Sequence, residues 1–100
     1  MADGGKSNDD IAMRIGALMK ALGHNQASFA ALIGITQPAL NNYLKAIRTP
    51  DLERAISISS KTGVTLDWLY LGDRSGLPSR MLELLPDLSG PRETATKRSG

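Results

Sequence analysis

The sequence predicts an all-α fold, with one domain of five short helices and a short C-terminal extension. Three observations predict it. Before Gly72, apolar residues recur at the three- and four-residue spacing of helices. Capping residues and glycines divide this pattern into short segments. Only 4% of the 100 residues are aromatic although 41% are hydrophobic, so the core must consist mainly of Leu, Ile and Ala, which suits packed helices.

The first two predicted helices lie in SNDDIAMRIGALMKALG and NQASFAALIG. In the first, Ser7 and Asp10 have the spacing of a capping box, and Gly23 is a stop signal. In the second, Asn25 is the expected N-cap and Gly34 ends the helix. The expected buried positions of these helices are Ile11, Ile15, Leu18, Met19, Leu22, Phe29, Leu32 and Ile33.

The other three helices lie in TQPALNNYLK, PDLERAISISSKTG and TLDWLYLG. The fourth begins through Pro50 and Asp51 and stops at Gly63, and the fifth has Thr65 as its N-cap. Trp68 of the fifth helix is expected in the core.

The composition changes after Gly72. DRSGLPS is typical of a linker, SRMLELL can form about two turns of helix, and SGPRETATKRSG is polar enough to be disordered. The apolar residues of SRMLELL either fold back onto the domain or meet a second subunit. The expected organisation is a flexible N-terminus at 1–8, the helical domain at 9–73, a linker with a possible short helix at 74–88 and a disordered tail at 89–100.

Charge is unevenly distributed along the chain. The formal net charge is only +2, yet no Asp or Glu occurs from Ile11 to Pro50. The basic residues of this block are Arg14, Lys20, Lys45 and Arg48. A long acid-free block favours a polyanionic partner. The competing interpretation is a chance run with scattered, solvated cations.

The segment GITQPALNNYLK has an unusual polar face. On a helical wheel, one arc is apolar and the other holds side-chain amides ending in a lysine. An ordinary solvent-facing surface would carry Glu and Lys, which form better helices. An amide offers a donor and an acceptor together, the pairing that recognises adenine in the major groove. The apolar arc comprises Ala39, Leu40, Tyr43 and Leu44, and the polar arc comprises Gln37, Pro38, Asn41, Asn42 and Lys45.

The second helix, the Gly34 turn and the third helix have the spacing of a helix-turn-helix, in which Ala30 permits close approach and Leu40 anchors the third helix. The run NQASFAALIGITQPALNNYLKAIRTP, followed by GVTLDWLYLGD, resembles the Cro and phage-repressor type of DNA-binding domain, the XRE family. The resemblance covers about residues 9–73 and implies a five-helix, lambda-repressor-like fold with a recognition helix at 36–45.

The resemblance also implies roles for individual residues. The expected base contacts come from Gln37, Pro38, Asn41 and Asn42. The expected phosphate contacts come from Asn25, Gln26, Thr36, Lys45 and Arg48. Gln26 would in addition brace the recognition helix, and Thr36 would be its N-cap.

The sequence departs from the family pattern in several places. Met19 and Leu44 stand where the family usually has a partly buried Arg–Glu pair, and we expect these two apolar side chains to touch. Ala46 replaces the usual glycine after the recognition helix, where a positive φ would strain it. Pro38 disfavours a helical conformation at Gln37, which leaves an alternative to the Thr36 cap: the helix begins at Pro38 with Gln37 as its cap.

The sequence contains no cysteine and a single histidine, His24, which we expect to pack or cap rather than to bind a ligand. It has no Gly-rich phosphate loop and no nucleophile paired with a base, so we expect no catalysis, cofactor, metal or small-molecule ligand. No apolar run approaches the ~20 residues of a membrane span, and the polar start is not a signal peptide. We expect a cytoplasmic protein without a self-cleaving or effector domain.

Together these features predict a sequence-specific transcriptional regulator that binds double-stranded DNA, more readily a repressor than an activator. A homodimer is expected because one small module buries limited area on DNA. The alternative is an antitoxin or regulator that binds a partner protein through residues 70–88. The expected dimer or partner surface comprises Tyr70, Leu71, Met81, Leu82 and Leu85.

Overall fold

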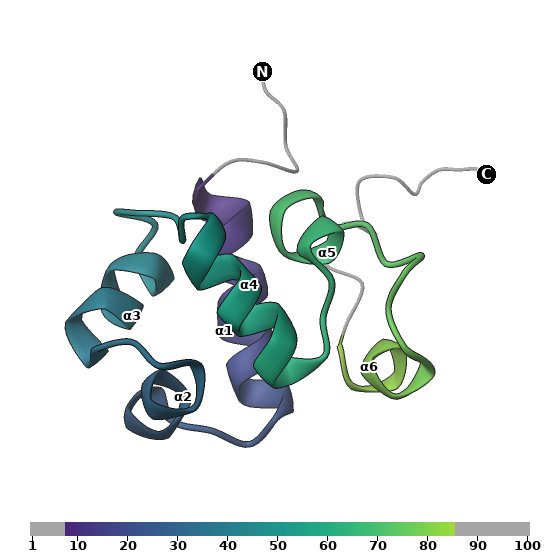
Figure 1. The fold of residues 1–100 in the computed structure, drawn as a ribbon, viewed down its shortest axis with the longest axis horizontal. Helices are drawn as coiled ribbons and strands as arrows, with labels where there is room; N and C mark the ends of the chain where they lie inside the picture. The colour runs from purple at the N-terminus through teal and green to yellow at the C-terminus, as the bar shows by residue number, and fades with distance from the viewer. Residues whose placement is uncertain (1–7, 86–100) are drawn as a thin grey trace.

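The computed structural model describes residues 8–85, which form six helices and no strand (Figure 1). The all-α prediction is confirmed, and the sixth helix lies in the stretch SRMLELL. The expected Ser7 cap, most of the N-terminal segment and the tail from residue 86 lie outside the described residues. The helices are α1 (Asn8–Ala21), α2 (Gln26–Ile33), α3 (Gln37–Leu44), α4 (Leu52–Thr62), α5 (Leu66–Leu71) and α6 (Ser79–Leu84).

Four helices begin at side-chain caps, of which Asn25, Thr36 and Thr65 were predicted as caps and Asp51 only as the start of its helix. The side chains of Asn25, Thr36, Asp51 and Thr65 each accept a hydrogen bond from the backbone N–H three residues later. The expectation that Gln37 caps α3 is wrong, because Thr36 is the cap and Gln37 is the first helical residue. A proline in the first turn is tolerated there, since its missing N–H would have no partner within the helix.

All six helices contribute side chains to one core, and α3 and α6 lie on opposite sides of α1 and α4 (Figure 1). It is made mainly of aliphatic side chains with few aromatic rings, as the composition requires. Trp68 is 2% exposed, which confirms its expected core position. The largest fully buried side chains are Trp68, Phe29, Ile15, Leu18, Ile33, Leu40, Ile58, Leu69, Met81 and Val64.

Arg14 belongs to the interior rather than to the charged surface. It is only 7% exposed, and its Nη1 donates to the carbonyl oxygen of Leu69 at 3.1 Å. The guanidinium therefore joins α1 to the last turn of α5, where helix carbonyls lack intrahelical donors. Arg14 was expected among the cations facing a polyanion, and its burial removes it from that set.

The α6 helix folds back onto the domain. Met81 is fully buried and Leu85 is 2% exposed, so assigning these two residues to a dimer or partner surface is wrong. Arg74 fixes the end of α6, because its Nη1 donates to the carbonyl oxygen of Leu85 at 2.9 Å and its Nη2 to that of Leu82 at 3.3 Å. Met81 and Leu85 are four residues apart, about one helical turn, and both reach the core.

Candidate nucleic-acid interface

The turn between α2 and α3 has the geometry that a helix-turn-helix requires. Gly34 has a φ of 78°, and its N–H donates to the carbonyl oxygens of Ala30 at 2.9 Å and Ala31 at 3.3 Å. Ala30 is 2% exposed, which fits its role at a close helix approach. From α4, the hydroxyl of Ser57 donates to the carbonyl oxygen of Ile33 at 2.7 Å. This bond between Ser57 and Ile33 was not predicted from the sequence, and it fixes the end of α2 against the core.

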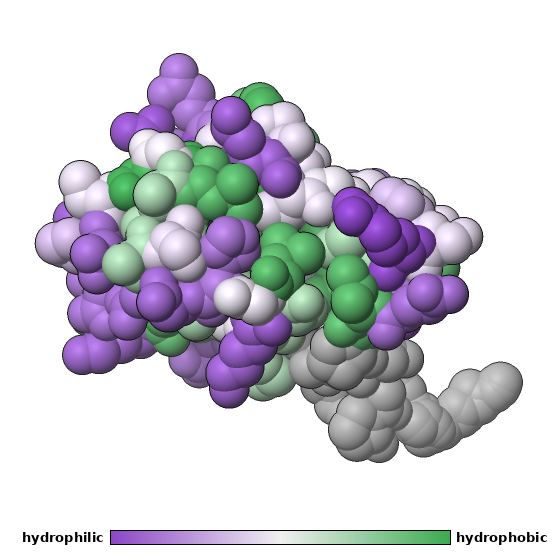
Figure 2. Space-filling view, turned by 90° about the horizontal axis from the view of Figure 1, so that it is seen from below, coloured by the Kyte–Doolittle hydropathy of each residue, from purple (hydrophilic) through white to green (hydrophobic). Residues whose placement is uncertain are grey.

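The α3 helix turns its apolar arc inward, as predicted. Leu40 is fully buried and Tyr43 is 8% exposed. On the opposite side, Gln37 and Pro38 are exposed at the start of the helix. Hydrophilic residues cover much of the end of the molecule where α2 and α3 lie, as the view from below shows (Figure 2). The outer side of α3 is therefore free to meet another molecule.

The amides of the polar arc are not equally exposed. Asn41 and Asn42 are half-buried. The Nε2 atom of Gln26 donates to Oδ1 of Asn41 at 3.4 Å, so Gln26 braces the recognition helix as expected. This bond uses one of the two lone pairs of the Asn41 oxygen, so the Asn41 side chain keeps its two N–H donors and one acceptor position for an outside partner.

Two expected phosphate contacts, Asn25 and Thr36, are engaged in capping. Oδ1 of Asn25 accepts from the Ser28 N–H at 2.8 Å, and Oγ1 of Thr36 accepts from the Ala39 N–H at 3.2 Å. Both side chains still have donors for a phosphate: the amide N–H groups of Asn25 and the hydroxyl of Thr36.

His24 has the packing and capping role that the sequence predicts. Its Nδ1 shares a hydrogen bond of 2.9 Å with the Ser28 hydroxyl, and its ring lies 6.0 Å from that of Phe29. Among the described residues, no group of His, Cys, Asp or Glu side chains is arranged to hold a metal ion.

The loop after α3 places two cations beside the recognition helix. Lys45 and Arg48 are exposed, which suits phosphate contacts. Burial raises the pKa of the nearby Tyr43 hydroxyl, as does the charge of Asp51, while the charges of Arg54 and Arg48 lower it. The first acid after the block, Asp51, is the N-cap of α4, so its carboxylate is directed to the Arg54 N–H at 2.9 Å.

The residues expected on a partner surface have different environments. Tyr70 is half-buried, and its hydroxyl donates to the carbonyl oxygen of Pro50 at 2.9 Å, which makes it a brace between α5 and the start of α4. Leu71 is 49% exposed and Leu82 is 38% exposed, so both remain available. Leu52 and Ile56, one turn apart on α4, are exposed apolar residues that the sequence analysis did not single out.

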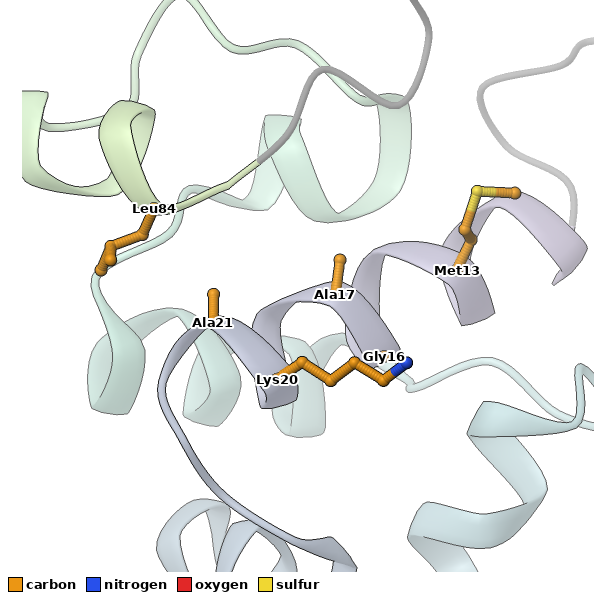
Figure 3. Close-up of a pocket in the computed structure, with 6 residues that line it drawn as sticks. All are labelled: Met13, Gly16, Ala17, Lys20, Ala21 and Leu84. Atoms are coloured by element: carbon orange, nitrogen blue, oxygen red, sulfur yellow. The ribbon is translucent and has the colours of Figure 1, made fainter.

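A groove of about 520 Å³ runs along α1 and is closed at one end by Leu84 of α6 (Figure 3). Ala17 and Ala21 point from α1 toward the side on which Leu84 lies. Most of its lining is small or apolar, with Lys20 as its one charged residue, so the groove holds no group for catalysis. None of the residues expected to contact DNA lines it.

A helix-turn-helix family model, HTH_3, matches residues 5–69 of the chain. The chain therefore belongs to this family, the XRE type of Cro and phage-repressor helix-turn-helix proteins, whose members are DNA-binding regulators rather than enzymes. Searches of curated proteins and of solved structures found no match to the chain. None of the described helices is long and apolar enough to cross a membrane.

Proposed function

We propose that this protein is a sequence-specific repressor of transcription that inserts α3 into the major groove of an operator. The observation that carries the proposal is the exposed outer side of α3, with amides and no acid, in a chain of the helix-turn-helix family. The block without Asp or Glu from Ile11 to Pro50 adds a favourable field for a polyanion. A small protein bound at an operator blocks polymerase by occupying the site, and the cytoplasm is where it would meet DNA.

Base recognition falls to the exposed start of α3 and to the amides behind it. Within residues 8–85 the side chain of Gln37 makes no hydrogen bond, so it can use its donor and acceptor together, as adenine requires. Asn41, with its oxygen held by Gln26, would donate to an acceptor such as guanine O6 or N7. Asn42 reaches the flanking bases or backbone, and Pro38 offers an apolar surface to a thymine methyl group.

Dimer formation is the second part of the proposal. With Met81 and Leu85 buried, we select three of the exposed apolar side chains for this surface, Leu71 at the end of α5 and Leu52 and Ile56 on α4. The Tyr70 hydroxyl is bonded to the Pro50 carbonyl just before α4, so the start of α4 lies beside α5. A second copy seated there would cover these side chains and bring two recognition helices to one operator.

The test is selection of bound duplexes from random DNA at near-physiological salt. A palindrome with half-sites about one helical turn apart is the expected result. Gln37→Ala should then cost about 1–3 kcal/mol of binding free energy at one base position and relax the preference there. Folded protein that binds DNA weakly at low salt but enriches no sequence would contradict the proposal. That outcome would favour binding of a partner protein through residues 70–88, of which Leu71 and Leu82 are exposed.

A further inference from the structure

The recognition helix ends in a hydrogen-bonded terminator built on an alanine. The Ile47 N–H donates to the carbonyl oxygen of Asn42 at 2.9 Å, and the Ala46 N–H donates to that of Tyr43 at 3.1 Å. These two bonds define a Schellman motif, whose left-handed position usually holds glycine. Ala46 occupies it with a φ of 63° and is the one non-glycine residue of positive φ in the described part of the chain.

The terminator lacks one of its usual supports. In most Schellman motifs the residue after the left-handed position packs its apolar side chain onto the preceding helix. Here that residue is Ile47, which is 61% exposed. A left-handed alanine is disfavoured about fivefold relative to glycine. The loop therefore needs another contact to hold this shape.

The start of α1, which is distant in sequence but adjacent in the fold, supplies that contact. Nδ2 of Asn8, in the first turn of α1, donates to the carbonyl oxygen of Ala46 at 3.3 Å, across 38 positions of sequence. The Asn42 carbonyl also accepts from the Arg48 N–H at 3.2 Å. The loop that carries Lys45 and Arg48 is thus fixed on one side by α3 and on the other by α1.

We propose that Asn8 is a positioning residue for DNA binding, which holds the strained Ala46 loop in the shape that presents Lys45 and Arg48 to phosphates. The proposal rests on the proposed function, in which these two cations contact DNA. A hydrogen bond of ordinary net strength changes a population about two- to tenfold, comparable to the disfavour of the left-handed alanine. Without Asn8, part of the population leaves the competent shape, and the apparent affinity falls by that fraction.

The first experiment needs no DNA. Amide hydrogen exchange at Ile47 and Arg48 reports opening of the loop, because both N–H groups donate to the Asn42 carbonyl. Asn8→Ala should speed exchange at both sites about two- to tenfold. Asn8→Asp, which keeps the shape of the side chain but has no donor, should do the same. In the A46G background exchange should be slower overall, because glycine adopts the left-handed conformation without strain, while each substitution at Asn8 should still speed it by a similar factor, since the backbone carbonyl that accepts the bond is kept.

The second experiment measures DNA affinity, at a temperature where every variant is fully folded by circular dichroism. N8A should weaken binding about two- to tenfold, and A46G should restore the affinity of the N8A protein. A merely structural role would lower the melting temperature without this rescue. Unchanged exchange in N8A, or an equal loss of DNA affinity from N8A in the A46G background, would overturn the proposal.

The reference variant Arg48→Ala tests the phosphate contact of the loop separately from the positioning of the loop by Asn8. If Arg48→Ala weakens binding and N8A does not, Asn8 does not position the loop, and the proposed function stands. If Arg48→Ala leaves DNA binding unchanged, the loop does not contact phosphates. Faster exchange in N8A would then show a structural tie only, and the positioning role would be rejected together with the phosphate role.

Discussion

Substituting Gly72 by alanine should cost far more stability than the same change at Gly34. Both glycines have a φ of 78° at a helix C-terminus, so alanine pays a similar conformational cost of about 1 kcal/mol at each. Their surroundings differ. A Cβ atom at Gly34 would meet nothing within 4 Å, whereas at Gly72 it would lie 2.7 Å from Nη2 of Arg14 and 3.1 Å from Cζ and Nε.

The cost depends on whether Arg14 can move away. A guanidinium on a free side chain would swing aside easily, but this one is 7% exposed and donates to the Leu69 carbonyl. Displacing it forfeits a charge-assisted hydrogen bond worth about 1.5–3 kcal/mol. We therefore expect a loss of about 2.5–4 kcal/mol for Gly72→Ala, against about 1 kcal/mol for Gly34→Ala.

Urea denaturation of the two variants measures the difference, provided that the m-values agree with that of the parent protein. A double-mutant cycle with Arg14→Ala identifies its source. In the R14A background, Gly72→Ala should cost only the conformational share of about 1 kcal/mol. Equal losses for the two glycine variants in the parent protein would refute the reasoning and show that Arg14 relaxes freely.

Three further predictions concern the interface, the braces and the core. Arg48→Ala should weaken binding to all duplexes alike and reduce the magnitude of the slope of log affinity against log salt by about one unit, measured by a fluorescence titration over several salt concentrations. Burial first, then the charge of Asp51 and the proximity of Tyr43, raise the pKa of Tyr70. The folded state therefore favours the protonated phenol of Tyr70. Its contribution to the free energy of unfolding is present below the ordinary pKa of 10.0 and is lost as the pH rises through the pKa of the folded state. Tyr70→Phe should consequently flatten the alkaline fall in urea midpoint as pH rises from 10.0 upward, and a fall as steep as in the parent would contradict this. In the core, Leu44→Glu should destabilise by several kcal/mol as an unpaired, partly buried charge, and adding Met19→Arg should recover most of the loss if the two side chains touch. No recovery would place them apart.

Local signals in the sequence predict the helix boundaries well. The side chains of Asn25, Thr36 and Thr65 cap helices where they were expected, because a cap depends on residues only three apart. Gln37 was misassigned from the same kind of evidence. Pro38 disfavours the helical conformation at Gln37, and Thr36 favours the cap position that makes Gln37 helical. In the structure the preference of Thr36 prevails, which neither residue alone predicts.

Residues whose environment depends on distant parts of the chain were less predictable. Arg14 looks like a surface cation in the sequence, yet it is buried because the end of α5 supplies the Leu69 carbonyl as an acceptor. The burial of Met81 and Leu85 likewise depends on a fold-back whose direction no local pattern encodes. The sequence left open whether these apolar side chains pack back or meet a partner, and tertiary packing decides it.

The same distinction applies within the candidate interface. The identity of its side chains is local, but their placement depends on ties from other helices. Ser57 of α4 holds the end of α2, Gln26 of α2 holds Asn41, and Asn8 of α1 holds the loop after α3. Each tie is a single hydrogen bond, worth about 1 kcal/mol in stability, so its loss leaves the domain folded. Its loss would still change which orientations the amides and cations sample, because the interface residues lie at helix ends and in a loop. Binding should therefore be more sensitive than stability to substitutions at these three donors.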